Sequence, residues 1–416
     1  MLNRSHKVFY GWWIVIASFF IMLYAGGVII YGFTAFFEPI ADDLGWSYMQ
    51  ISLAASLRGL ELGLFAPLTG MLTDRWGPRR LIFGGIVITA AGLIILGNTT
   101  SLGMFYGAFA LTAIGISACT VTVLMTALAN WFRRKSGIAS GIAMCGFGFS
   151  GLLVPVIVIL IEVYGWHTAS IILGLGMLAI LPLSLLFRHK PEQYGYLPDG
   201  QLRNPITYNN DLPQVTRVKV GMKQALKSGT FWRLTLSFTY WSMVVSAAIT
   251  HVMPCLSTVS VTRSMSSLVV VAITLISIGG RLGFGWLGDK LDRKLVAAVG
   301  FTMMGFGLLC FGYTSTGTIW LVPFLVLFGI GYGGGSALRP SLVREYFGRS
   351  SFGAIFGLMA GINMLGNVIG PTAAGWVYDN WGSYQAIWLV FGGLAIVAVI
   401  STLTIRPVSK GEDRNR

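Results

Sequence analysis

The sequence predicts an all-α polytopic membrane protein, with twelve transmembrane helices arranged as two six-helix bundles. Composition is the first reason: 55% of the 416 residues are hydrophobic, 11% are charged, and the mean hydropathy is +0.73. Soluble domains carry about twice that share of charge. The second reason is that apolar runs of about 20 residues, long enough to cross a bilayer as helices, recur along the chain. The third is that the two halves repeat the same landmarks at one spacing.

Twelve apolar runs have the length and composition of membrane-spanning helices. The first is longer than the apolar core of a secretory signal and leads directly into further spans, so we expect it to stay in the mature protein. Because the number of spans is even, both termini are expected on the same side. The predicted spans are 10–36, 47–73, 81–98, 104–132, 137–163, 168–188, 230–256, 266–287, 295–314, 317–343, 351–377 and 383–405.

Basic residues gather on one set of predicted loops. Both terminal tails and the loops on the same side hold most of the Lys and Arg, whereas Arg263 is the basic residue of the opposite loops. Because Lys and Arg accumulate on cytoplasmic loops, we expect both termini in the cytoplasm and a location in the plasma membrane, in a bacterium the inner membrane. The net charge of +14 reflects this bias. Nucleic-acid binding is not expected, since it needs a basic soluble surface.

The longest hydrophilic segment, from Arg188 to Gly229, divides the predicted spans six and six. We therefore expect an N-terminal six-helix bundle at 1–189, a cytoplasmic central loop at 190–228 and a C-terminal six-helix bundle at 229–416.

Landmarks in the two halves repeat at a constant offset of 215 residues. Each pair falls at the same predicted depth of its half, which indicates parallel repeats related by an axis along the membrane normal. The pairs are Gly70 with Gly285, Trp131-Phe132 with Tyr346-Phe347, and Trp166 with Trp381.

The loop after the second span reads GMLTDRWGPRR, residues 70–80. Its acidic residue can face a helix N-terminus, and its arginines can engage helix C-termini, acidic groups or lipid phosphates. The motif resembles the loop signature of the major facilitator superfamily, which implies a secondary transporter fold. By this resemblance the conformational latch comprises Gly70, Asp74, Arg75, Gly77 and Arg79, with Asp289 from the second copy at 285–294. The alternative is a turn that carries only the positive-inside bias.

The second copy of the loop departs from the first, because Asp292 stands where the first copy has Gly77.

A narrower resemblance comes from WFRRKSGIASGIAMCGFGFSG, which starts at Trp131 and is similar to the fifth-span signature of the monocarboxylate transporter branch and its bacterial oxalate/formate relatives. Ser136 and Ser150 replace a basic residue and a glycine of that pattern. Branches that carry sugars, drugs or nitrate remain open.

Arg281 is the candidate substrate-binding cation. It lies in the eighth predicted span, eight residues before Asp289, or about 12 Å along the helix. No acidic residue lies within one turn on its face of the helix, where Ser277 and Gly285 stand instead. Guanidinium binds carboxylate with two parallel hydrogen bonds, and a span-8 arginine followed by small residues is similar to the substrate arginine of monocarboxylate transporters. The alternatives are an acidic partner on another helix, or a side chain that snorkels to the cytoplasm.

Other polar residues within the spans are candidates for the same cavity. His251 in span 7 changes charge near neutral pH, so it can carry a proton or donate to a carboxylate, although a lone histidine is more often a satisfied polar residue. The expected substrate-binding hydrogen-bonding residues are Tyr332, Asn363, Ser277 and Tyr31.

Arg58 and Glu61 lie in an otherwise uncharged stretch from Leu44 to Thr73. Their i,i+3 spacing lets them pair on one helix, which costs less than burying either charge alone. One interpretation is a structural ion pair. The other is proton coupling, in which Glu61 takes up a proton and Arg58 is released toward the anion.

The sequence therefore predicts a secondary transporter of a small monocarboxylate such as lactate or pyruvate, coupled to protons and operating by rocker-switch alternating access. The alternative is an organic-anion antiporter or an exporter of another small molecule. A membrane enzyme or sensor without transport is not expected, because HExxH, paired catalytic carboxylates and a Ser/His/Asp arrangement near one membrane face are missing from the sequence. Because GxxxxGK[ST] is also missing, we expect an ion or substrate gradient to supply the energy. We expect no catalytic residues, cofactor or metal site, and a functional monomer with an organic anion, a proton and the lipid bilayer as partners.

Overall fold

The structure is a computed structural model, and it describes residues 9–132, 136–189, 191–194, 222–347 and 352–405. In helix α3 (Tyr48–Trp76), the side chains of residues 57–64, 66–68, 70, 71 and 74 also lie outside the described part. Most of the predicted central loop at 190–228 falls outside the described residues as well.

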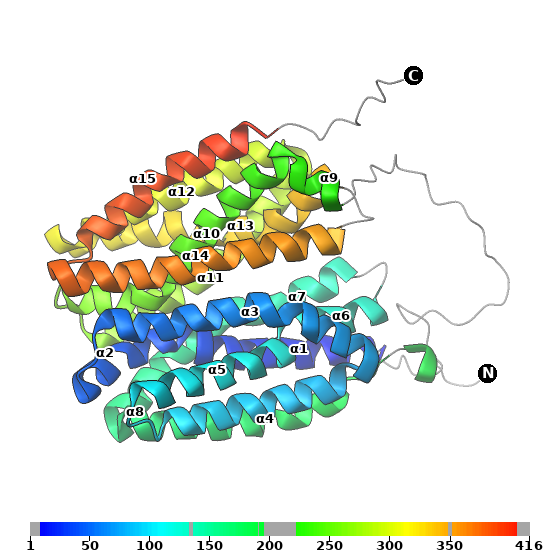
Figure 1. Ribbon diagram of the computed structural model, residues 1–416, viewed down its shortest axis with the longest axis horizontal. Helices are drawn as coiled ribbons and strands as arrows, with labels where there is room; N and C mark the ends of the chain where they lie inside the picture. The colour runs from blue at the N-terminus through cyan, green and yellow to red at the C-terminus, as the bar shows by residue number, and fades with distance from the viewer. Residues whose placement is uncertain (1–8, 133–135, 190, 195–221, 348–351, 406–416) are drawn as a thin grey trace, which may run out of the picture. The chain divides into compact units, whose positions relative to one another are not determined.

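The chain divides by its contacts into two compact units (Figure 1). Unit 1 comprises Met1–Gly32 and Leu64–Asp211, and unit 2 comprises Phe33–Gly63 and Leu212–Arg416, so α3 contributes to both. The expected bundle boundaries at 189 and 229 stay predictions.

In unit 1, the helices are α1 (Gly11–Ala25), a π-helix (Gly26–Tyr31), α4 (Pro78–Leu96), α5 (Leu102–Cys119), α6 (Val121–Trp131), α7 (Ser136–Phe149) and α8 (Leu153–Ala179). In unit 2, they are α2 (Phe33–Leu44), α9 (Met222–Lys227), α10 (Gly229–Ser257), α11 (Arg263–Lys290), α12 (Arg293–Gly312), α13 (Leu321–Phe347), α14 (Phe352–Trp381) and α15 (Gln385–Leu403). Short 3-10 helices cover Ser150–Leu152, Leu181–Leu186, Pro191–Tyr194, Thr314–Thr316 and Thr318–Trp320. None of the described residues is in a β-strand.

Ten helical segments of the described residues are long and apolar enough to cross a membrane. One of them, Ile138–Leu186, has 49 residues, about twice the length that one crossing needs. Its helix α8 breaks at Gly165, whose φ of 76° favours glycine. Dividing this segment at Gly165 and adding the 29-residue helix α3 gives the twelve spans that the sequence predicts.

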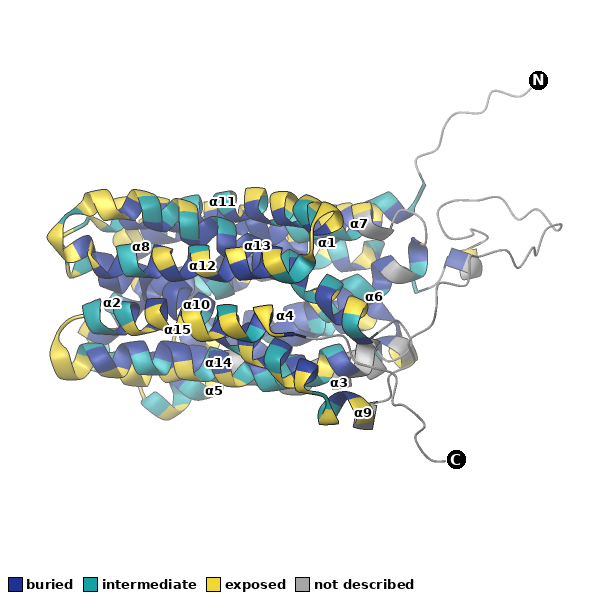
Figure 2. Cartoon of the chain, turned by 90° about the horizontal axis from the view of Figure 1, so that it is seen from above, coloured by how far each residue is buried: buried dark blue, intermediate teal, exposed yellow. Residues whose placement is uncertain are grey.

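The helices bury one face and expose large apolar side chains on the other (Figure 2). In α11, Leu282 is 69% exposed and Trp286 58%, and in α15 Ile396 is 63% exposed. Exposed apolar surface on this scale is costly in water and suits contact with lipid chains.

The repeated sequence landmarks occupy equivalent helix ends in the two halves of the chain. Trp131 ends α6 and Phe347 ends α13. Trp166 follows the break at Gly165, and Trp381 ends α14 directly before Gly382, which also has a positive φ of 64°. The internal repeat in the sequence therefore corresponds to a repeat of helix boundaries.

Helices α11 and α13 lie side by side with no room for side chains at their closest points. A Cβ atom added at Gly280 would collide with the backbone carbonyl of Ile330, and one added at Gly333 would collide with that of Ser277. Small residues at such positions let helices approach closely in lipid, where hydrophobicity does not drive association. This contact fixes the position of Arg281, on α11, along the axis of the neighbouring helix α13.

The start of α3 is capped by two separate groups. Ser47 and Gln50 form a reciprocal capping box, with Gln50 Oε1 accepting from the Ser47 amide at 2.9 Å and Ser47 Oγ accepting from the Gln50 amide at 3.2 Å. The carboxylate of Asp379, at the end of α14, accepts from the amides of Tyr48 at 3.0 Å and Met49 at 2.8 Å. Asp379 thus satisfies two amides that a helix start leaves open.

Further along the same contact, Ser56 of α3 bonds to two residues of α14. Its hydroxyl lies 2.8 Å from Thr372 Oγ1 and 2.8 Å from the carbonyl of Val368. Together with Asp379 these bonds form a polar seam between the first half of α3 and α14, which we call the α3–α14 seam.

We expect Gly280→Ala to destabilise the folded protein by about 1–3 kcal/mol, because the new methyl group must displace the Ile330 carbonyl. Gly279→Ala is the matched control, since nothing lies within 4 Å of its added Cβ. Thermal unfolding of both variants in detergent measures the difference. Equal melting temperatures would contradict the close contact of α11 with α13.

We expect Asp379→Ala to remove the cap on Tyr48 and Met49 and to weaken the start of α3 by about 1 kcal/mol. Hydrogen exchange of a peptide covering these two amides should become faster. Asn380→Ala is the control, because among the described residues the Asn380 side chain bonds within its own helix, to the Trp376 carbonyl at 2.8 Å. Exchange that is the same in both variants would rule out the cap.

Candidate functional site

Arg281 lies beside an aromatic side chain inside the membrane-spanning part of unit 2. Its guanidinium carbon is 5.7 Å from the centroid of the Tyr332 ring, within the range of a cation–π contact. The Tyr332 ring is in turn 5.8 Å from the ring of Trp241 on α10. The structure therefore brings two of the predicted substrate-binding residues, Arg281 and Tyr332, together. It adds Trp241, which the sequence had not singled out.

Asn363, a third predicted residue, is 2% exposed and lies on α14. The amide orientation that gives each of its polar atoms a suitable partner places its oxygen 3.0 Å from an Arg339 nitrogen. Its nitrogen then donates to Thr239 Oγ1 at 3.0 Å and to the carbonyls of Met359 and Thr235 at 3.2 and 3.1 Å. Asn363 thus holds a second arginine in place.

Arg339, like Trp241, is a residue of this region that the sequence had not singled out. It lies on α13, within a predicted span and directly before Pro340. Its guanidinium carbon is 4.9 Å from the ring centroid of Phe356 and 5.8 Å from that of Phe238. Within the described part of the chain, no carboxylate lies within ion-pair distance of it. The signal that could have revealed it is the same one that revealed Arg281, an arginine without an acid nearby on its helix.

The remaining two predicted substrate-binding residues have other surroundings. Ser277 is fully buried, and its hydroxyl donates to the Thr274 carbonyl at 2.6 Å. Tyr31 ends the π-helix of unit 1 and is 2% exposed, whereas the residues around Arg281 belong to unit 2. Their roles in binding stay predictions.

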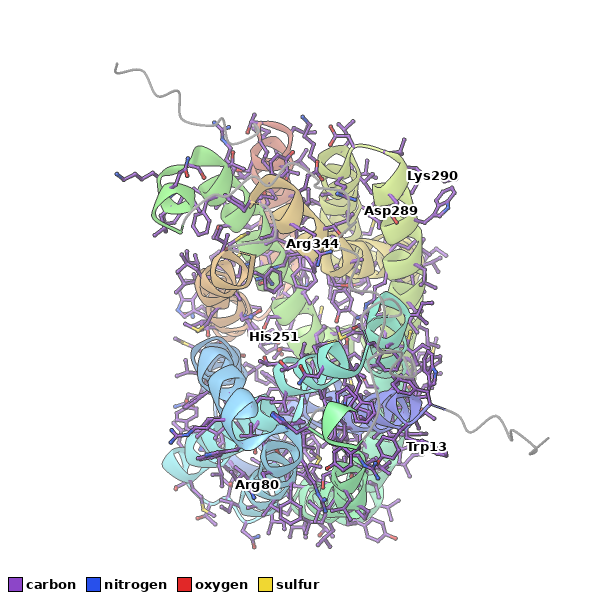
Figure 3. The ribbon with its side chains drawn as sticks, turned by 90° about the vertical axis from the view of Figure 1, so that its right-hand side faces the viewer. Trp13, Arg80, His251, Asp289, Lys290 and Arg344 are labelled. Atoms are coloured by element: carbon purple, nitrogen blue, oxygen red, sulfur yellow. The ribbon has the colours of Figure 1, made fainter. Side chains whose placement is uncertain are left out.

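His251 on α10, labelled in Figure 3, is fully buried. Both of its ring nitrogens have hydrogen-bonding partners. Nε2 lies 2.9 Å from the Pro371 carbonyl and 3.0 Å from Ser52 Oγ, and Nδ1 lies 3.0 Å from the Tyr384 hydroxyl. Since a carbonyl only accepts, Nε2 carries the proton, and Nδ1 can accept from the tyrosine. A neutral ring thus satisfies all of these contacts, and His251 extends the α3–α14 seam to α10.

The side chains of Arg58 and Glu61 lie outside the described part of the structure. The backbone of both residues is in the continuous helix α3, so their i,i+3 spacing is helical as expected. Their ion pair and their coupling role stay predictions.

In the predicted latch, the turn before α4 depends on Gly77, whose φ is 81°. A Cβ at this position would also come within 3.2 Å of His189 Nδ1. Glycine is therefore favoured here on both conformational and steric grounds. Arg75 and Arg79 are exposed, while Gly70 and the side chain of Asp74 lie outside the described part.

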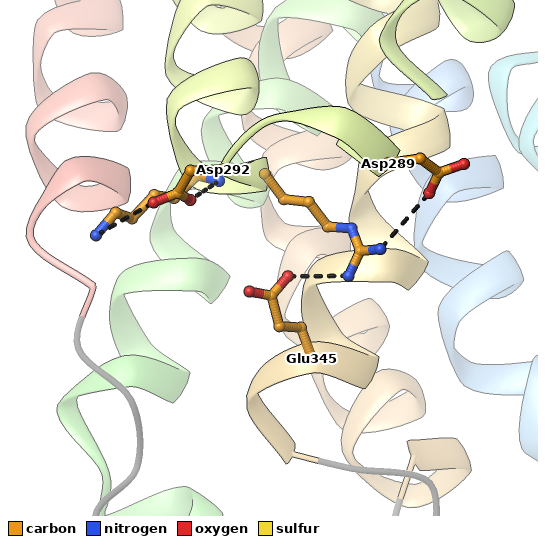
Figure 4. Close-up of polar contacts among 5 residues, drawn as sticks. Asp289, Asp292 and Glu345 are labelled. Carbon is orange, nitrogen blue, oxygen red and sulfur yellow. Dashed lines mark hydrogen bonds and ion pairs between the residues drawn. The ribbon is translucent and has the colours of Figure 1, made fainter. Parts of the chain in front are cut away.

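The second copy of the predicted latch forms a network of surface ion pairs (Figure 4). Asp289 Oδ1 is 3.6 Å from Arg293, whose other terminal nitrogen lies 3.1 Å from Glu345 Oε2 on α13. Asp292 caps α12 by accepting from the Lys294 amide at 3.0 Å. With the Asp289 side chain 79% exposed, such pairs contribute little to stability and form and break readily.

Metal-binding clusters of His, Cys, Asp or Glu are not found among the residues that the structure describes. The four cysteines, Cys119, Cys145, Cys255 and Cys310, are free thiols.

Known membrane transporters resemble this chain in sequence and in fold. The chain resembles Monocarboxylate transporter 12-B of Danio rerio, with 26% identity over 97% of this chain and 90% of that protein. It also resembles the Oxalate:formate antiporter of Oxalobacter formigenes, with 24% identity over 96% of this chain and 93% of that protein. Among solved structures, a bacterial homolog of the human lysosomal transporter Spinster aligns with a TM-score of 0.71 at 15% identity, covering 96% of this chain and 95% of that one.

The family model of the Major Facilitator Superfamily matches residues 14–261 and 252–416, nearly the whole chain. The relatives and the fold are those of membrane transporters and not of enzymes. Twelve membrane helices, repeated helix boundaries and the family match agree, and the chain belongs to the major facilitator superfamily.

Proposed function

We propose that this transporter moves a small monocarboxylate, such as lactate or pyruvate, together with a proton. The observation that carries the proposal is the position of Arg281 beside Tyr332 within the membrane-spanning helices of unit 2. An arginine at this depth is costly and is retained where it has a function. A carboxylate can accept two parallel hydrogen bonds from its guanidinium. The similarity to Monocarboxylate transporter 12-B supports the same substrate class.

Transport follows an alternating-access cycle in which two helix bundles, 1–189 and 229–416, rock about a central binding site. The loops around Gly77 and Asp289 act as the latches of this cycle. Glu61 carries the proton with Arg58 as its partner, and His251 is the second candidate carrier. The protein functions as a monomer in the plasma membrane, in a bacterium the inner membrane, with both termini in the cytoplasm.

Exchange of one organic anion for another is the second candidate mechanism. It is favoured by Arg339, which adds a second cation to unit 2 and thereby raises the number of anionic charges that the site can balance. The similarity to the Oxalate:formate antiporter supports it.

Arg281→Lys should reduce proton-driven uptake of labelled lactate or pyruvate into proteoliposomes about tenfold at low substrate concentration. Lysine keeps the charge but loses the bidentate fork, and about 1.4 kcal/mol of binding corresponds to this factor. The control is Arg293→Lys, at a surface ion pair of the cytoplasmic network. Uptake that Arg281→Lys leaves unchanged would remove Arg281 from the binding site.

Glu61→Gln should abolish accumulation driven by a proton gradient while leaving exchange of substrate across the membrane intact. His251→Gln, measured in parallel, should retain proton-driven accumulation, because a neutral ring satisfies all its contacts. If accumulation survives Glu61→Gln and is lost in His251→Gln, the proton carrier is the histidine. If wild-type uptake does not depend on the proton gradient but increases when anion is present inside the proteoliposomes, the transporter exchanges anions and is not a proton symporter.

A further inference from the structure

Helix α14 contains a proline in its interior, Pro371, and a side chain of a neighbouring helix replaces the hydrogen bond that this proline removes. Proline has no backbone N–H, so the carbonyl four residues earlier, that of Asn367, loses its donor within the helix. The hydroxyl of Ser246 on α10 donates to this carbonyl at 3.3 Å. A membrane helix tolerates proline where such a donor satisfies the carbonyl that the proline leaves open.

The same turn of α14 receives two further donors from other helices. The Val368 carbonyl accepts from Ser56 Oγ of α3 at 2.8 Å, and the Pro371 carbonyl accepts from His251 Nε2 of α10 at 2.9 Å. Donors from two neighbouring helices therefore cover one turn of α14, from Asn367 to Pro371. This turn is the one that the proline ring spreads, because the ring crowds the preceding carbonyls.

The two sides of the proline pack against different helices. Before it, a Cβ added at Gly370 would collide with the Met243 carbonyl of α10. After it, a Cβ added at Gly375 would collide with the Tyr48 carbonyl of α3. Backbones come this close in lipid where small residues remove the side chains between them. Pro371 thus separates a segment packed on α10 from a segment packed on α3.

We propose that Pro371 is a hinge of α14, and that Ser246 and Ser56 are positioning residues that keep its carbonyls hydrogen-bonded while the helix bends. A hinge absorbs a conformational change in a few residues. A backbone N–H is fixed by the helix, whereas a serine hydroxyl rotates and can follow a carbonyl as its angle changes. Bending at Pro371 changes the angle between the segment on α10 and the segment on α3 during the transport cycle.

The first test is a double-mutant cycle of Pro371→Ala and Ser246→Ala, measured on the full chain in detergent by hydrogen exchange of a peptide covering residues 372–378. Ser246→Ala should speed exchange about threefold, which corresponds to about 0.6 kcal/mol, the average for a hydrogen bond between membrane helices. Pro371→Ala should slow exchange, because alanine supplies the missing N–H to Asn367. In the Pro371→Ala background, Ser246→Ala should have no further effect, because the backbone then satisfies the carbonyl.

Ser267→Ala is the matched control for the serine change. Ser267 is 1% exposed, and among the described residues its hydroxyl bonds within its own helix, to the Ser264 carbonyl at 2.6 Å. This variant should leave exchange of residues 372–378 unchanged. If Pro371→Ala does not fold, Pro371→Gly takes its place in the cycle, since glycine also supplies the N–H.

The second test measures labelled pyruvate uptake into proteoliposomes, and this readout rests on the proposed function. Pro371→Ala should lower the maximal rate about threefold or more and leave the pyruvate concentration for half-maximal uptake unchanged, because the hinge moves but does not touch the substrate. Pro371→Gly should recover part of the maximal rate, because glycine keeps the backbone pliable. A proline with a purely structural role would lower the amount of folded protein and not the rate for each folded molecule.

Equal effects of Ser246→Ala in the wild-type and Pro371→Ala backgrounds would overturn the role of Ser246. Maximal rates at the wild-type value in Pro371→Ala would overturn the hinge while the proposed substrate stands. Failure of the wild type to take up pyruvate would overturn the proposed function instead, and the hydrogen-exchange cycle then decides the hinge by itself.

Discussion

The cost of placing guanidinium groups among membrane-spanning helices is the constraint on which the rest of the site depends. Such groups persist where aromatic faces, amide oxygens or a ligand replace the water that they have lost. In unit 2, Tyr332 covers Arg281, and Phe356 and Asn363 hold Arg339. These neutral contacts orient both guanidinium groups within the membrane-spanning helices.

Helix packing provides the positions of these side chains. Glycines at the contact of α11 with α13 bring the two backbones together and fix the level of Arg281 beside Tyr332. The α3–α14 seam uses hydrogen bonds in place of apolar side chains, and His251 joins it to α10. Polar contacts between membrane helices are modest in energy, so the seam orders these helices through several weak bonds and not through one strong one.

The fold could be predicted from the sequence because span length, hydropathy and the 215-residue repeat can be read from the order of residues without knowing which helices are in contact. Arg281 could be singled out because its own helix face carries no acid. Arg339 escaped notice because it lies close to the basic end of its predicted span, where arginines are common, and because its contacts come from residues of α10 and α14 that are distant in the chain. The contacts of His251 could not be predicted, since its partners Ser52, Pro371 and Tyr384 are each more than 100 residues away in the chain.

The central claim is that a carboxylate binds at Arg281. The most direct measurement is an experimental structure of the protein with 3-iodopropionate, whose iodine can be located by its scattering. We expect the carboxylate to pair with the Arg281 guanidinium beside Tyr332, with the iodine pointing along α13 toward Arg339. A ligand found in contact with neither arginine would contradict the account.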